Sequence, residues 1–86
     1  MDPDEFRARR QRRADFLRAL YQEVNGSVSE FVDGLELGAR IGVDSEETRR
    51  MIAYFEEKGA VMVDDHKSGV IRITAAGVDL VETEIP

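Results

Sequence analysis

The sequence predicts a single α+β domain that is mainly helical, with a three-helix core, a β ribbon of two or three strands and a short C-terminal helix. Apolar residues recur at helical spacing in three separate stretches before Gly59. After Gly59 the pattern changes to alternation and to β-branched residues, which favour strands. The chain has 86 residues, and this length allows one compact core rather than two domains.

The first predicted helix occupies residues 1–26 and begins with a basic arm. Asp2 is a capping residue, and Pro3 suits the first helical position. An apolar stripe follows at helical spacing and consists of Phe16, Leu17, Leu20, Tyr21 and Val24. Gly26 suits the left-handed position that ends a helix. The part through Arg13 has few apolar residues, so we expect it to project beyond the core.

The remainder of the domain, residues 27–86, opens with an ambiguous segment and two further helices. Residues 27–32 include three apolar residues and predict either a brief strand or a buried turn. Asp33 predicts the cap of a short helix that ends at Gly42, and Asp44 predicts the cap of a third helix. The expected inward face of the third helix consists of Thr48, Met51, Ile52 and Phe55.

A ribbon and a closing helix are predicted for the end of the chain. Apolar residues alternate over residues 61–64, and residues 70–73 are rich in β-branched side chains. Residues 65–69 between them end in a glycine that is placed for a hairpin turn. Thr74 then predicts the cap of a short C-terminal helix. These elements would bury their apolar faces only by packing together.

Three runs of this sequence resemble the winged helix-turn-helix superfamily. Residues 35–44 (LELGARIGVD) resemble the first helix and turn of the motif, and residues 48–61 (TRRMIAYFEEKGAV) resemble a recognition helix leading into the wing. Residues 73–77 (ITAAG) resemble the exit from the wing in many small prokaryotic members. The similarity covers roughly residues 28–82, and the layout is like that of MarR, ArsR and PadR regulators without matching one of them. The resemblance implies a third helix in the DNA major groove, a wing on the backbone or minor groove, and a dimer.

Charge is unevenly distributed along this acidic chain, whose net charge is −6. Residues 5–18 carry six arginines against two acidic residues, whereas residues 19–86 carry six basic and 14 acidic residues. A basic arm of this kind can meet a polyanion, and a solvated helix face is the alternative. The acidic body opposes strong non-specific DNA binding, because long-range attraction follows the overall field.

The main functional hypothesis is a DNA-binding protein, a small prokaryotic transcriptional regulator that acts as a homodimer on double-stranded DNA. Arginine can read guanine through two hydrogen bonds, and serine can contact phosphate. The expected groove-reading residues are Ser45, Arg49 and Arg50. The expected phosphate contacts are Arg40, Lys67 and Arg72, with Arg9, Arg10, Arg12 and Arg13 from the arm.

Acidic residues at the start of the third helix oppose DNA binding there, and a purely structural role for this helix stays open. Asp44, Glu46 and Glu47 stand at the end that would approach phosphate, although acids there also stabilise a helix N-terminus. Glu46 is spaced to pair with Arg50, which would occupy an arginine that DNA reading needs.

The alternative function is a protein–protein interaction or dimerisation module without DNA binding. An exposed apolar patch involving Phe6, Val63 or Ile85 would serve it. The expected dimer contacts are Phe6, Phe16, Leu17 and Tyr21. Core packing within one chain explains Phe16 and Leu17 equally well, whereas Phe6 is harder to bury internally.

Several other classes of protein are not expected. The chain has no cysteine and one histidine, His66, so we expect no disulfide, metal or cofactor. No nucleophile-and-base pair or glycine-rich phosphate loop is visible, so we expect no enzyme. The N-terminus has no apolar stretch, and no apolar run approaches the roughly 18 residues of a membrane span, so we expect a cytoplasmic protein.

Overall fold

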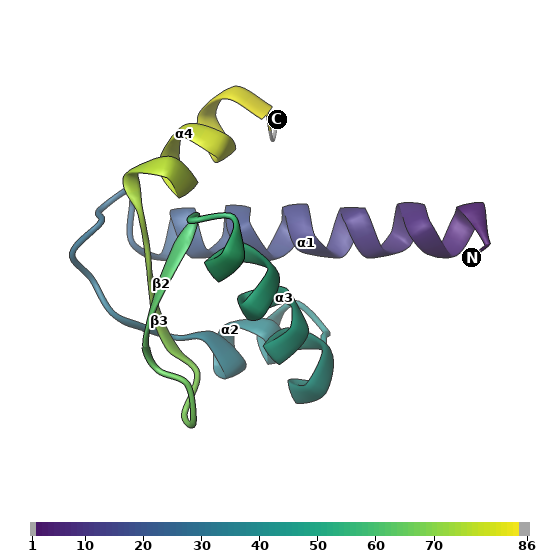
Figure 1. Cartoon of the computed structure of the whole chain (residues 1–86), viewed down its shortest axis with the longest axis horizontal. Helices are drawn as coiled ribbons and strands as arrows, with labels where there is room; N and C mark the ends of the chain where they lie inside the picture. Colours follow the sequence, from purple (N-terminus) through teal and green to yellow (C-terminus); the bar gives the residue numbers. More distant parts are fainter. Residues whose placement is uncertain (1, 85–86) are drawn as a thin grey trace.

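The computed structural model describes residues 2–84, and within them the fold is α+β and mainly helical (Figure 1). The elements in chain order are α1 (Pro3–Glu23), β1 (Val32–Asp33), α2 (Gly34–Arg40), α3 (Ser45–Glu57), β2 (Val61–Asp65), β3 (Val70–Ile73) and α4 (Ala75–Glu84). The predicted fold class and element order are confirmed at this level. The arrangement is compatible with a winged-helix layout.

Aspartate side chains cap the first three helices, as the sequence predicts. Asp2 accepts a hydrogen bond from a backbone N–H in the first turn of α1, and Asp33 accepts two in the first turn of α2. Asp44 accepts one from the backbone N–H of Glu47 at 2.8 Å. These bonds satisfy N–H groups that have no partner within the helix. The end of α1 is also determined by local residues, because Asn25 and Gly26 both adopt positive φ.

The sheet is antiparallel and has the strand order β1-β3-β2. The ambiguous segment before α2 contributes only Val32 to it, opposite Ile71, and Asp33 completes β1. Phe31 lies just outside this strand and is 63% exposed, so the segment is not a buried turn. The register of β2 against β3 shifts at Asp64, which is the extra residue of a bulge beside the hairpin turn.

One apolar core joins all layers. Its buried members are Phe16, Leu17, Leu20, Val24, Val32, Leu37, Val43, Met51, Ile52, Phe55, Ala60, Val61, Ile71, Ile73 and Val81. The predicted inward face of α3 is confirmed, since all four of its residues are buried. Thr48 is the buried polar member, and its hydroxyl donates to the backbone carbonyl of Asp44 at 2.8 Å. Its polarity is thereby satisfied inside the core.

Two glycines permit close packing between elements. A Cβ at Gly38 of α2 would collide with the side chain of Thr48 in α3. A Cβ at Gly77 of α4 would collide with the backbone of Ala60, just before β2. The lack of a side chain therefore sets how closely α2 approaches α3 and α4 approaches the sheet.

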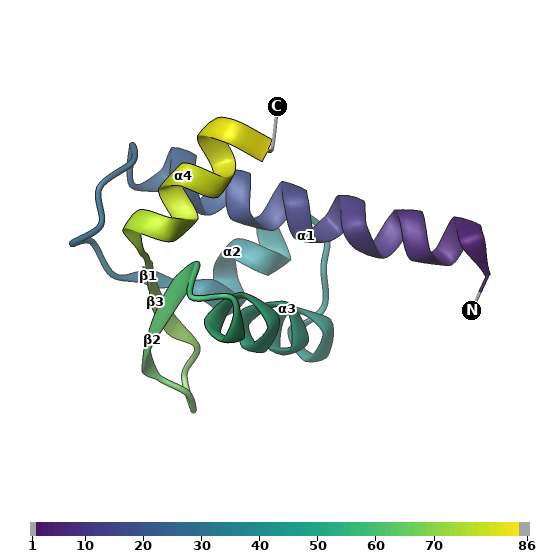
Figure 2. The ribbon, with the colours of Figure 1, turned by 45° about the horizontal axis from the view of Figure 1, so that its top comes forward.

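The first turns of α1 extend away from the body, as expected from their composition (Figures 1 and 2). Phe6 in this arm is about half exposed, whereas Phe16 and Leu17 have no exposed surface. Phe16 and Leu17 are used by the chain's own core, so they offer no surface to a second subunit, and the prediction of dimer contacts fails for them. Tyr21 is partly buried, and its hydroxyl donates to Glu82 of α4 at 2.7 Å. Within residues 2–84, no helix is long and apolar enough to cross a bilayer.

Candidate nucleic-acid interface

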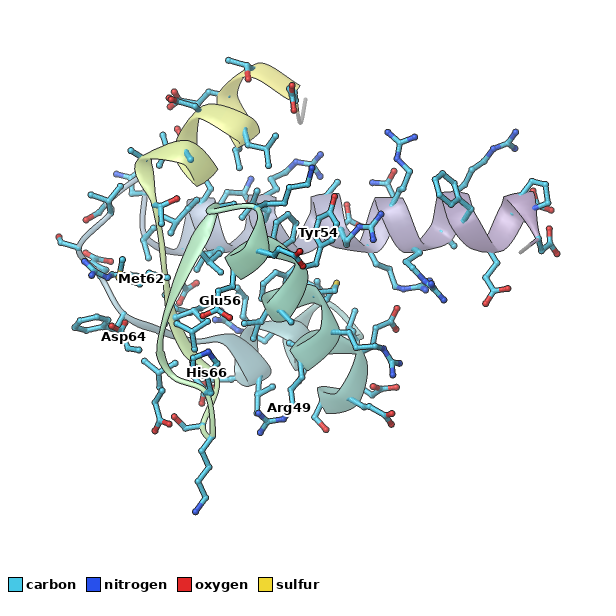
Figure 3. All side chains as sticks on the ribbon, in the orientation of Figure 1. Arg49, Tyr54, Glu56, Met62, Asp64 and His66 are labelled. Atoms are coloured by element: carbon cyan, nitrogen blue, oxygen red, sulfur yellow. The ribbon has the colours of Figure 1, made fainter. Side chains whose placement is uncertain are left out.

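Helix α3 separates two surfaces that both contain predicted site residues. Figure 3 shows Arg49 and Glu56 on the side of α3 toward the β2–β3 hairpin, and Tyr54 on the side toward α1. This division follows from the inward face of α3, which is anchored in the core and leaves its two flanks free. Ser45 is exposed at the N-terminal end of the same helix.

Arg49 connects α3 to the hairpin turn. Its guanidinium donates to the backbone carbonyls of His66 at 2.9 Å and Lys67 at 2.8 Å. A second bridge lies nearby, where the imidazole of His66 is 3.0 Å from a carboxylate oxygen of Glu56. In the free chain Arg49 therefore holds the hairpin against α3, a structural task that the sequence did not reveal.

The hairpin turn is ordered locally and mixes charges. The carboxylate of Asp65 accepts hydrogen bonds from the Ser68 hydroxyl and from the backbone N–H of Lys67. These bonds, that of Ser68 first, lower the pKa of Asp65 below its usual value. Lys67 is exposed in this turn. Lys67, a predicted phosphate contact, is therefore accessible, and the acidic residues Asp64 and Asp65 are close to it in sequence.

Arg50 lies on a highly exposed part of α3. It forms the predicted pair with Glu46, at 3.2 Å between nitrogen and oxygen, and the two side chains are 68% and 83% exposed. A pair this accessible contributes little to stability, because water competes with it and both side chains lose freedom. Arg50 can therefore exchange Glu46 for another anion at small energetic cost.

The basic arm contacts α3 through two arginines. Arg12 donates from Nε to the Glu47 carboxylate at 2.7 Å, and these side chains are only 37% and 24% exposed. Arg13 places its guanidinium over the ring of Tyr54, 4.3 Å from the centroid. The arm is thus fixed relative to α3 by an ion pair and a cation–π contact.

A hollow of about 560 Å³ lies between α1 and α3. Its lining includes Arg9 and Arg13 from the arm and Arg50 from α3, with Tyr54 and Met51. The structure thereby brings together arginines from predicted sites that are 37 or more positions apart in sequence. A smaller hollow adjoins it across Arg13 and Tyr54, and its lining includes Arg10, Lys58 and Glu84.

The other two predicted phosphate contacts lie elsewhere. Arg40 pairs with Glu23 of α1 at 3.2 Å, and that hydrogen bond raises its pKa above the usual value. Arg72 of β3 donates to the sulfur of Met62 at 2.8 Å and lies 5.8 Å from the ring centroid of Phe31. Neither arginine lines the hollow between α1 and α3.

Tyr54 lines the hollow between α1 and α3, and sequence reasoning did not select it as a site residue. Its position in the chain identifies it only as a flank of α3, because the arginines that surround it come from α1. Glu47 was likewise interpreted as a capping acid, whereas its side chain reaches Arg12. Contacts between distant segments decide both roles, so spacing within one helix could not show them.

Comparisons with family models, with curated proteins and with solved structures found no significant match.

Proposed function

We propose that this chain is a winged helix-turn-helix protein that binds double-stranded DNA. In this proposal α3 is the recognition helix and enters the major groove, and the β2–β3 hairpin is the wing. A small prokaryotic transcriptional regulator is the corresponding biological role. It would act as a homodimer, for which Phe6 and Tyr21 remain the candidate contacts.

The observation that carries the proposal is the placement of cations on both flanks of α3. Arg9 and Arg13 lie beside Arg50 on the flank toward α1, and Lys67 is exposed in the turn of the wing. The rest of the chain is acidic, so the concentration of positive charge is local to the flank toward α1, whereas on the wing Lys67 has Asp65 beside it. Phosphates on either side of a major groove would meet cations while α3 lies between them.

Each side chain has a distinct role in this arrangement. Ser45 and Arg50 lie on the exposed N-terminal half of α3 and would contact base edges or phosphate. Arg49 keeps the wing at a fixed distance from α3 through its two hydrogen bonds to the turn. Lys67, together with Arg9, Arg10, Arg12 and Arg13 of the arm, would neutralise phosphates.

The test is a fluorescence-anisotropy titration with a mixed pool of duplex DNA fragments, at about 50 mM and 200 mM salt. We expect affinity to fall linearly in log–log terms as salt rises, because each neutralised phosphate releases counterions. Arg50→Ala should weaken binding by about 1–3 kcal/mol and relax sequence preference, and Lys67→Gln should reduce the salt slope by about one. Arg7→Gln changes the net charge equally, outside the proposed interface, and is the control. The absence of binding at low salt would overturn the proposal.

An exposed apolar patch favours protein–protein contact as the second candidate function. Phe31 and Met62 are both exposed, and they flank Arg72, whose Nε is buried without a hydrogen-bond partner among residues 2–84. Exposed apolar groups around an arginine are typical of interaction surfaces. Of the patch residues expected from the sequence, Val63 is partly buried against the core, and Ile85 lies outside the described residues. If this candidate is correct, the chain shows no salt-sensitive DNA binding, and Phe31→Ser abolishes partner binding while the chain stays folded.

A further inference from the structure

The hollow between α1 and α3 is lined by an aromatic ring and carries more positive charge than its surroundings. Arg9, Arg13 and Arg50 line it together with one carboxylate, that of Glu47. Its volume of about 560 Å³ is in the range of small-molecule sites. The adjoining hollow shares Arg13 and Tyr54 with it, so this pair stands between the two concavities.

Arg13 is held in place by a contact that leaves its hydrogen-bond donors free. Its guanidinium lies over Tyr54 at 4.3 Å from the ring centroid, and no carboxylate within residues 2–84 lies within 4.0 Å of its nitrogens. A stacked guanidinium keeps its N–H groups at the edge, in the planar arrangement that matches phosphate oxygens. Arg13 is therefore positioned before any ligand arrives.

Three carboxylates lie beside this group of arginines, and each is paired with one arginine. Glu47, the carboxylate of the lining, is engaged by Arg12 at 2.7 Å. Arg9 has its carboxylate partner, Glu5, at 3.8 Å on the exposed surface of the arm. Arg50 has only the exposed pair with Glu46. Exposed pairs of this kind exchange readily, so Arg9 and Arg50 can turn toward an anion in the hollow.

We infer that this hollow is a binding site for a nucleotide, that is, a phosphate group next to a planar base. Arg13, with Arg9 and Arg50, binds the phosphate, and the base packs against the part of the Tyr54 ring that Arg13 leaves exposed. Aromatic rings combined with arginines bind the bases and phosphates of nucleotides without sequence preference. The source of the nucleotide is either a free mononucleotide or an unpaired nucleotide of a single strand. This inference does not depend on duplex binding by α3.

The experiment combines calorimetric titration of the whole chain with amide NMR shifts. The probes are ADP, adenosine, inorganic pyrophosphate and an oligothymidylate. We expect ADP to shift amides of residues 9–14 and 47–54. Adenosine and pyrophosphate should each bind at least tenfold more weakly, because each lacks one of the two sets of contacts. If oligothymidylate displaces ADP at a concentration lower than that of ADP itself, a single strand is the source. The opposite order identifies the free nucleotide.

Matched variants separate the site from general charge. Arg13→Gln should weaken ADP binding about tenfold, whereas Arg7→Gln, an equal change of charge on the same helix, should stay within about twofold. Tyr54→Leu should weaken binding about fivefold, and Tyr54→Phe should keep it. The amide spectrum of each variant shows that it is folded.

Three results would overturn the inference. These are unchanged amides in the hollow with every probe, equal losses in Arg7→Gln and Arg13→Gln, or normal ADP affinity in Tyr54→Leu. A chain that binds ADP but no duplex DNA would refute the proposed function alone, so the two failures are distinguishable.

Discussion

The two halves of α1 belong to one continuous helix but are stabilised by different forces. In the C-terminal half, Phe16, Leu17 and Leu20 are fully buried. In the N-terminal half, residues 2–11 are exposed, and their side chains form local pairs such as Arg7 with Asp4 and Arg9 with Glu5. A short isolated helix is marginal in water because its first turn is costly to form. The buried half provides that turn, and the arm continues from it.

The largest expected effect is the removal of a buried ring from the C-terminal half. Phe16→Ala should destabilise the protein by about 3–5 kcal/mol, because it deletes a core side chain and leaves a cavity beside Phe55. Urea unfolding followed by circular dichroism measures this change. Phe6→Ala removes the same side chain from the arm and should change stability by less than about 0.5 kcal/mol. Equal effects would mean that the arm is packed like the core.

The next effect compares two aspartate caps. Asp44→Ala should lower global stability by about 1 kcal/mol, because it removes the cap of a helix that is part of the core. Asp2→Ala removes the same kind of cap from the exposed arm. We expect it to reduce helicity at 222 nm slightly and to leave the urea midpoint unchanged. A shifted midpoint in Asp2→Ala would show that the arm and body unfold together.

A smaller effect is expected where the arm meets α3. Glu47→Gln leaves Arg12 without its carboxylate partner and should destabilise by about 0.5–1 kcal/mol, since this pair is partly buried. Hydrogen exchange should also become faster in residues 9–13. Glu5→Gln, which affects the exposed pair with Arg9, is the matched control and should leave both measurements unchanged.

The smallest expected effect is the pH dependence of a contact that the C-terminal half of α1 makes with α4. The hydrogen bond from Tyr21 to Glu82 raises the pKa of the Tyr21 phenol above its usual value. The phenol must be protonated to donate. This contact therefore stabilises the α1–α4 packing below the pKa of an unfolded tyrosine and loses its effect as pH rises through the folded pKa. Titration of tyrosinate absorbance should show a lower pKa for Tyr21 in Glu82→Gln, and an unchanged titration would contradict this cause.

Local features of the fold could be predicted from sequence, and contacts between distant segments could not. The caps at Asp2, Asp33 and Asp44 are interactions within four residues, and all three predictions are confirmed. The inward face of α3 follows from helical periodicity, which is also local. β1 was ambiguous because its partner, β3, lies nearly 40 residues further along the chain.

In the candidate site, too, local features could be predicted and contacts between distant segments could not. Ser45 and Arg50 were predicted to read the groove and Lys67 to contact phosphate. All three residues are exposed, as these roles require, and the roles themselves stay predictions. The grouping of Arg9, Arg13 and Arg50 depends on the angle at which α1 crosses α3. The stacking of Arg13 on Tyr54 depends on it too. A pattern within one helix has no information about that angle.

The two hydrogen bonds from Arg49 to the hairpin turn also have a consequence for the thermodynamics of recognition. A turn that is already immobilised loses little conformational entropy when a ligand contacts it, so less of the binding free energy is spent on ordering. Arg49→Lys would retain the charge but cannot hold two carbonyls with one planar group. Under the proposed function, DNA binding by the Arg49→Lys variant should show a more unfavourable entropy at nearly unchanged enthalpy. Its association rate should also be lower.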